Sequence, residues 1–102
     1  MTELADLTAT EAARRIRTGR LTATELMEAQ LDRITAREPA LRAFAWFNPA
    51  QALAAAHAVD RAGASGPLAG ISFGVKDVLD TADMPSQYGS PAWAGHRPRS
   101  DA

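Results

Sequence analysis

The chain is organised around one short stretch, Gly70-Ile71-Ser72-Phe73-Gly74-Val75-Lys76-Asp77. Its apolar residues alternate with small or polar ones, so that Ile71, Phe73 and Val75 fall on one face of an extended backbone. This alternation predicts a strand over residues 70–76. Lys76, at the end of that strand, is the only lysine in the protein, because every other member of the 11 lysines and arginines is an arginine.

A single lysine in a chain that otherwise uses arginine points to a chemical role for its amine. Burial can leave a lysine amine neutral and therefore basic, whereas arginine stays charged. Lys76 is therefore a candidate catalytic base or nucleophile, and a Schiff-base amine is one form of that chemistry. The alternative is an ordinary solvated lysine at the end of a strand.

The composition is that of a small globular protein of 102 residues, with 46% hydrophobic residues and a formal net charge of −1. A protein that binds nucleic acid or an anionic membrane usually carries an excess of basic residues, and a net charge of −1 gives no such excess. No apolar run is long enough to cross a membrane, and the N-terminus lacks the apolar core of a signal peptide. Cysteine is absent, which excludes disulfides and thiolate chemistry. We therefore expect a cytoplasmic protein with no nucleic-acid or membrane partner.

Two helix starts are encoded by a repeated pentapeptide, which occupies residues 7–11 and 21–25. In each copy a threonine precedes a glutamate by three residues, which is the spacing of a capping box. The pattern predicts a helix over residues 9–18 that stops at a glycine, and a second over residues 23–37 that stops before Pro39. The second helix carries an apolar stripe that should pack against a core: Leu26, Met27, Leu31 and Ile34.

The middle of the chain predicts a strand–helix–strand unit. Residues 42–47 are short, apolar and aromatic, which is typical of a strand. An asparagine–proline pair then supplies the cap and first turn of a helix over residues 49–62. With the strand at 70–76, this order predicts a βαβ unit of parallel strands and hence an α/β fold. Residues 78–102 show no helical period and contain several prolines and glycines, so we expect a long irregular loop there.

Other candidate sites have less support. His57 has no second histidine or carboxylate one helical turn further on, so no metal site is expected. Residues 70–76 lack the glycine spacing of a phosphate-binding P-loop. Ser90, His96 and Asp101 can be combined on paper into a catalytic triad, but triads are recognised by geometry and not by order in the chain.

A resemblance to a known family is carried by Gly66–Asp77, with the sequence GPLAGISFGVKD. This segment resembles the first signature block of the amidase signature family, roughly G-P-L-x-G-I-P-x-x-V-K-D. Residues 80–90 resemble the family's continuation, D-T-x-x-x-x-T-x-x-G-S, and the preceding helices also fit, so the similarity covers nearly the whole chain. Two positions depart from the pattern: Ser72 stands where the family usually has proline, and Ser86 where it often has threonine.

The resemblance implies a fold and a mechanism. In that family the matching lysine is the base of a Ser–cis-Ser–Lys triad, so Lys76 is the catalytic residue expected here, with no cofactor and no metal. Asp77 is expected to hold the turn after the strand and to transfer no proton. Both serines of the triad lie downstream in a Gly/Ser-rich block, in members several times longer, and no such block occurs here. We therefore expect residues 1–102 to be the N-terminal portion of a single amidase domain, with a mixed sheet covered by helices, and to be inactive alone.

Three functions stay open at this point. The first is an amidase that hydrolyses carbon–nitrogen bonds of small-molecule amides. The second is the amidase subunit of a glutamine-dependent tRNA amidotransferase, which releases ammonia from glutamine for a partner subunit. The third is a non-catalytic truncated product or helical interaction module. The sequence names neither the amide nor the oligomeric state, and a homodimer is one state left open.

Overall fold

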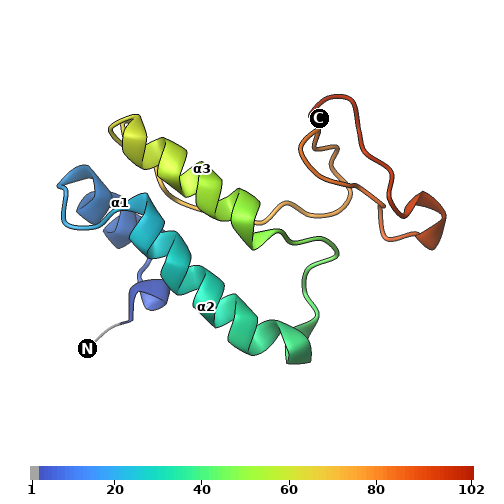
Figure 1. The fold of residues 1–102 in the computed structure, drawn as a ribbon, viewed down its shortest axis with the longest axis horizontal. Coiled ribbons are helices and arrows are strands. Elements are labelled where there is room, and N and C mark those ends of the chain that lie inside the picture. Colours follow the sequence, from blue (N-terminus) through green and yellow to red (C-terminus); the bar gives the residue numbers. More distant parts are fainter. Residues whose placement is uncertain (1–2) are drawn as a thin grey trace. The chain divides into compact units, whose positions relative to one another are not determined.

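The computed structural model describes residues 3–102, in which every regular element is a helix (Figure 1). In chain order the elements are η1 (Leu4–Asp6), α1 (Ala9–Arg17), α2 (Ala23–Leu41), α3 (Pro49–Arg61) and η2 (Pro91–Trp93). The residues form two compact units, of which the first comprises the described residues up to Ala43 together with Asn48–Ser72. The second unit comprises Phe44–Phe47 and Phe73–Ala102. No helix in the described range is long and apolar enough to cross a membrane.

The start of α1 shows half of the predicted capping box. The Thr8 hydroxyl accepts a hydrogen bond from the Glu11 amide at 3.1 Å. The Glu11 carboxylate does not complete the box, because it accepts hydrogen bonds from the guanidinium groups of Arg14 and Arg15 at 2.6 and 3.0 Å. Those bonds, the one from Arg14 first, lower the pKa of Glu11 to about 2.

The start of α2 shows the complete box that the sequence predicts. The Glu25 amide donates to the Thr22 hydroxyl, and the Thr22 amide donates to the Glu25 carboxylate, both at 3.0 Å. Leu21 and Leu26, which flank this box at the positions of a hydrophobic staple, are both buried in the core. The local signal at this helix start is therefore confirmed in every part.

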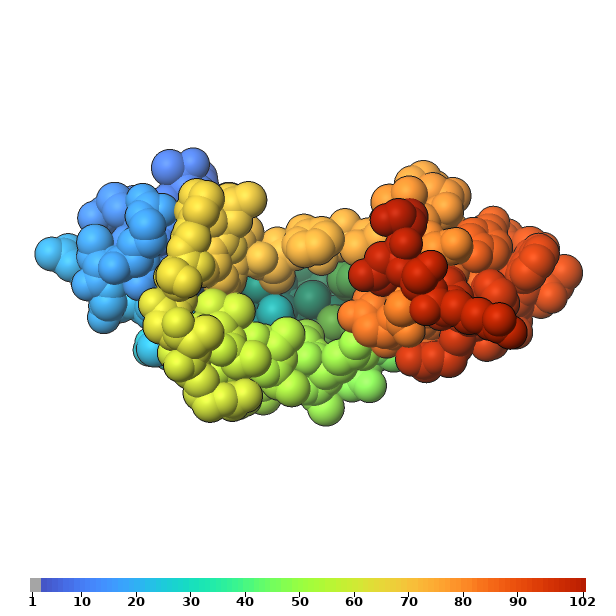
Figure 2. Space-filling model, turned by 90° about the horizontal axis from the view of Figure 1, so that it is seen from above, coloured from blue at the N-terminus to red at the C-terminus, as the bar shows by residue number. Residues whose placement is uncertain are grey.

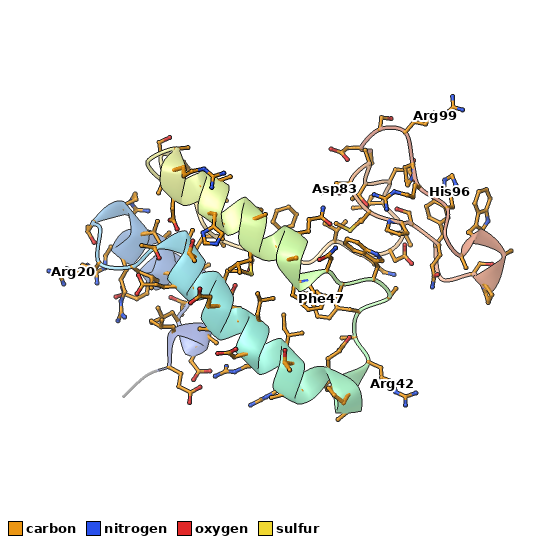
Figure 3. The ribbon with its side chains drawn as sticks, in the orientation of Figure 1. Arg20, Arg42, Phe47, Asp83, His96 and Arg99 are labelled. Atoms are coloured by element: carbon orange, nitrogen blue, oxygen red, sulfur yellow. The ribbon has the colours of Figure 1, made fainter. Side chains whose placement is uncertain are left out.

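The predicted end of α2 is wrong, because the helix continues through Pro39 to Leu41 instead of stopping at residue 37. Pro39 lacks the backbone N–H that would donate to the carbonyl of Thr35, yet the helix continues for two more residues. Here the Arg42 amide donates to the Glu38 carbonyl at 2.7 Å. Arg42, with φ 50, then ends the helix in the left-handed region, and its side chain is exposed (Figure 3).

The ends of α1 and α3 share one backbone arrangement. At the end of α1 the Gly19 amide donates to the Ile16 carbonyl at 3.2 Å, and the Arg20 amide donates to the Arg15 carbonyl at 2.9 Å. This pair of bonds is a Schellman motif, and it requires the positive φ that glycine adopts without strain. The same pair of bonds ends α3 at Gly63. Both helices thus stop within one residue of the end that their glycines predict.

The core of the first unit is small, because most of its buried side chains are short. The helix α2 packs against α3 and against η1 (Figure 1). Of the predicted stripe on α2 only Leu26 is buried, and its other members are half-buried. The buried hydrophobic residues are Ala12, Ala13, Ile16, Leu21, Ala23, Leu26 and Ala56.

The two predicted strands, and with them the βαβ unit and the α/β architecture, are wrong for the part of the chain that the structure describes. Residues 42–47 and 70–76 have no ladder of backbone hydrogen bonds. A strand exists only where a neighbouring strand supplies the hydrogen-bond partners that a helix finds within itself. Neither segment faces such a neighbour among residues 3–102, and the apolar side chain of Phe73 is left 84% exposed.

The irregular loop predicted over residues 78–102 makes up most of the second unit, and η2 is the one short helix within it. Backbone hydrogen bonds close it at two places. The Ser86 amide donates to the His96 carbonyl at 2.8 Å, and the Ala102 amide donates to the Asp80 carbonyl at 2.9 Å. Figure 2 shows the segment, coloured orange to red, as a continuous mass of atoms.

Candidate functional site

Lys76 lies in the second unit immediately before a tight turn. Its carbonyl accepts hydrogen bonds from the amides of Val78 at 2.7 Å and Leu79 at 3.2 Å. Its side chain is exposed, and the ammonium has no hydrogen-bond or ion-pair partner among residues 3–102. The described residues therefore hold the backbone of this lysine while leaving its amine open to further groups.

Asp77 connects the backbone beside Lys76 to the loop. Its carboxylate accepts a hydrogen bond from the Gln87 amide at 3.0 Å. The sequence predicts that Asp77 holds the turn directly after the lysine, whereas its carboxylate here bonds to an amide ten residues further along the chain. A hollow of about 230 Å³ within the second unit is lined by Ala45, Trp46, Asp77, Pro85, Gln87 and Gly95.

Two side-chain hydroxyl groups form hydrogen bonds within the loop. Ser86 is buried, with 2% of its surface exposed, and its hydroxyl donates to the Leu79 carbonyl at 3.4 Å. The Tyr88 hydroxyl donates to the Asp80 carboxylate, and this bond raises the pKa of Tyr88. The serine at position 86 thus keeps a hydroxyl that a threonine would also supply.

The structure does not assemble Ser90, His96 and Asp101 into the catalytic triad considered from the sequence. The Ser90 hydroxyl accepts a hydrogen bond from an amide of η2 at 3.3 Å, and the Asp101 carboxylate accepts one from a loop amide at 2.8 Å. The His96 ring, labelled in Figure 3, lies with its centroid 5.1 Å from that of Trp93 and 6.0 Å from that of Tyr88. Each of the three residues has a structural partner, so no nucleophile is activated here.

The backbone that leads to the lysine is fixed at two points of the first unit. Gly70 has φ +85, and a Cβ at this position would lie 2.8 Å from Ile16 Cδ1 and 3.0 Å from Ala23 Cβ. Two residues later the Ser72 hydroxyl donates to Gln30 Oε1 at 2.8 Å. Sequence reasoning identified Gly70 and Ser72 as parts of a motif but not as contacts with α1 and α2.

Sequence reasoning missed a carboxylate that binds the N-terminus of α2 from α3. Asp60 accepts hydrogen bonds from the Ala23 amide at 2.8 Å, the Thr24 amide at 3.0 Å and the Thr24 hydroxyl at 2.6 Å. These bonds, the one from the Thr24 hydroxyl first, lower the pKa of Asp60. No local pattern could have shown this, because Asp60 follows Thr24 by 36 residues.

His57 completes this network. Its Nδ1 lies 3.0 Å from the Thr24 hydroxyl. That hydroxyl already donates its one proton to Asp60, so it accepts from a protonated Nδ1 of His57. Within residues 3–102 no three histidines or carboxylates lie close enough together to hold a metal ion.

Replacing Asp60 by alanine should destabilise the first unit by about 2 kcal/mol at neutral pH, because it leaves the first amides of α2 without their acceptor. A lowered pKa means that this stabilisation is present above the ordinary value of 3.8 and is lost as the pH falls through the folded-state pKa. Denaturant unfolding at pH 7 and at low pH measures the difference. Asp32→Ala, an exposed carboxylate on α2, is the matched control. A difference between wild type and Asp60→Ala that stays constant down to the lowest pH would contradict this account.

Comparison with known proteins supports the resemblance that the sequence around Lys76 suggested. Residues 25–102 match the family model described as Amidase. The chain belongs to the amidase family. The match contains Lys76, Asp77 and the whole loop, so the resemblance drawn from the sequence is confirmed. No solved structure matches the chain.

The curated relatives carry two kinds of name. A protein named as a glutamyl-tRNA(Gln) amidotransferase subunit, from Chloroflexus aggregans, is 48% identical over the full chain, and one of the same name from Salinispora arenicola is 43% identical. A protein named putative amidase AmiD, from Mycobacterium bovis, is 40% identical over 97% of the chain. The chain spans 22% of the length of each of these relatives.

Proposed function

We propose that this chain supplies the catalytic base of an amidase that hydrolyses carbon–nitrogen bonds of small-molecule amides, and that Lys76 is that base. The observation that carries the proposal is the position of Lys76. It is the only lysine, it lies in the segment that matches the amidase family, and its amine is exposed and unpaired among the described residues.

The proposed chemistry follows the family pattern. A neutral Lys76 amine accepts a proton from a bridging serine, and that serine accepts the proton of a second serine, which attacks the amide carbonyl. The tetrahedral intermediate then expels ammonia or an amine, which takes the proton back from Lys76 through the bridging serine, and an acyl–serine ester remains. Water hydrolyses the ester, which releases the carboxylic acid and restores the serine. The serines of this chain do not match the family's serine block, so a further segment must supply both serines. That segment must also shield the Lys76 amine from solvent.

A second candidate is the amidase subunit of a glutamine-dependent tRNA amidotransferase. The identities favour it, at 48% for a relative with an amidotransferase name against 40% for the relative named putative amidase. The two candidates share the lysine chemistry and differ in the amide that is cleaved. The second predicts that glutamine is hydrolysed in preference to simple amides, and that a partner protein receives the ammonia.

A reconstitution assay tests the proposal. The purified chain is mixed with the separately expressed remainder of the Chloroflexus aggregans relative, beyond the segment that this chain matches, and ammonia release from glutamine, acetamide and benzamide is measured. We refer to the resulting complex as the reconstituted enzyme. Neither part should release ammonia alone, and the reconstituted enzyme should do so.

Three outcomes would count against the proposal or refine it. Turnover by the chain alone would show a catalytic group other than the proposed triad. A complex that forms, as judged by gel filtration, yet hydrolyses none of the amides would contradict the amidase function. If the chain forms no complex and its circular dichroism spectrum is that of a partly unfolded protein, the result would support the hypothesis of a non-catalytic product.

A further inference from the structure

The last side-chain contact of the first unit, before the backbone continues to Lys76, is made by one serine. The Ser72 hydroxyl donates to Gln30 Oε1 at 2.8 Å, across 42 residues of sequence. Gln30 lies on α2, whose N-terminus is held by the capping box and by Asp60. Ser72 is also the last residue of the first unit. The hydrogen bond therefore joins the end of this segment to a well-fixed helix.

The residues on either side of Ser72 differ in how they are held. Before it, Gly70 packs on α1 and α2, and Ile71 is partly buried against the core. After it, Phe73 is 84% exposed. The amides of residues 72–76 donate no backbone hydrogen bond within the part of the chain that the structure describes. A segment without a ladder has few restraints of its own, so the Ser72–Gln30 bond is the restraint nearest to the lysine on its N-terminal side.

We propose that Ser72 is a positioning residue for Lys76, which acts by pinning the backbone to Gln30 where the family pattern has a proline. The proposal rests on the function proposed above for Lys76. A proline ring restricts φ at its own position, and a serine does not. The hydrogen bond replaces this internal restraint by an external one. Lys76 follows four residues later, within about 14 Å of chain reach, so freedom at Ser72 is transmitted to the placement of the amine.

The pin is tested on the isolated chain by nuclear magnetic resonance, without any catalytic readout. In Ser72→Ala or Gln30→Ala the backbone order parameters of residues 73–75 should fall clearly below their wild-type values, into the flexible range below about 0.6. The double variant should be no more mobile than either single variant, because both remove the same bond. Ser65→Ala, an exposed serine outside this contact, is the control. Unchanged order parameters in Ser72→Ala, or additive effects in the double variant, would overturn the proposal.

Ser72→Pro separates restraint from hydrogen bonding. Its ring should keep residues 73–75 ordered, and it should do so equally in the Gln30→Ala background, where the hydrogen bond cannot form. Loss of order in Ser72→Pro combined with Gln30→Ala would contradict the idea that the serine and the family's proline do the same work. The melting temperature of each variant shows that the first unit stays folded.

The kinetic test uses the reconstituted enzyme. Ser72→Ala should lower kcat roughly tenfold to a hundredfold with KM unchanged, because a displaced base affects proton transfer and not substrate binding. Ser72→Pro should restore kcat. If Ser72→Ala lowered the order parameters but left kcat unchanged, the Ser72–Gln30 bond would restrain the segment without positioning Lys76, and the positioning role would be overturned. If the wild-type reconstituted enzyme were inactive, the proposed function would fail, while the order parameters would still decide whether Ser72 pins the segment.

Discussion

Replacing Lys76 by alanine is expected to lower kcat of the reconstituted enzyme roughly a thousandfold, because a positioned general base contributes a factor of about 10² to 10⁴. Lys76→Arg should be equally inactive, since a guanidinium does not give up its proton in a protein and so cannot accept one. Ammonia release from glutamine and from simple amides, measured at saturating substrate, checks both variants. The loss should appear in kcat, because the lysine acts on the nucleophile and not on the bound amide.

The controls for this experiment follow from the surroundings of Lys76. Its side chain is exposed and has no partner among residues 3–102, so its removal should leave the melting temperature of the chain unchanged. Arg99→Ala removes another exposed cation from the same unit, and Figure 3 labels that residue. This variant should keep wild-type activity. A Lys76→Ala enzyme that retained more than about a tenth of the activity would exclude Lys76 as the base, given the size of the general-base effect.

The helices of this protein could be predicted because their signals are local. A capping box, a proline in the first turn and a glycine after the last turn each act within four or five residues, and a sequence displays such spacings directly. Thr22 and Glu25 form the expected pair of hydrogen bonds, and Gly19 and Gly63 end their helices as expected. Pro39 misled the prediction, because α2 continues two residues past it and ends only at Leu41, where Arg42 adopts the left-handed conformation.

The strands could not be predicted in the same way. Alternation of Ile71, Phe73 and Val75 describes a backbone that could pair with a neighbour, and it carries no information on whether the neighbour is present. Among residues 3–102 no segment pairs with 70–76, so the pattern remains unpaired: Phe73 and Val75 are exposed, whereas Ile71 packs against the core of the first unit. Secondary structure that depends on distant partners is thus lost where those partners are absent, whereas helices persist.

For the candidate site too, the sequence showed the local features and not the contacts between distant residues. The lysine itself was found from its uniqueness and its motif, which are properties of the sequence alone. The long-range contacts of the first unit join Ser72 to Gln30 and Asp60 to Thr24, across 42 and 36 residues. Such pairs arise only from the packing of α2 against α3 and of the following segment against α2. Their residue types, a serine with a glutamine and an aspartate with a threonine, have no distinctive local spacing.

Gly70→Ala is expected to be the most damaging single methyl addition in the first unit, at a cost of about 3 kcal/mol in the free energy of unfolding. Two effects combine: an alanine at φ +85 costs about 1–2 kcal/mol, and forcing a methyl group into a packed core costs about 1–3 kcal/mol. The added Cβ would lie 2.8 Å from Ile16 Cδ1, which can rotate away in part. It would also lie 3.0 Å from Ala23 Cβ, which cannot rotate away because it is attached directly to the first turn of α2.

Gly74→Ala is the matched control, because Gly74 lacks a positive φ and a Cβ there would meet nothing within 4 Å. It should change the free energy of unfolding by less than about 0.5 kcal/mol. Urea unfolding followed by circular dichroism measures both variants, and Gly70→Val should unfold at still lower urea, since a branched side chain tolerates a positive φ least. Equal effects of Gly70→Ala and Gly74→Ala would mean that the close approach to Ala23 is not made in solution. A large effect confined to Gly70 would instead show that this glycine lets the segment at residues 70–76 approach the N-terminus of α2. That is the same helix end that Asp60 holds from α3.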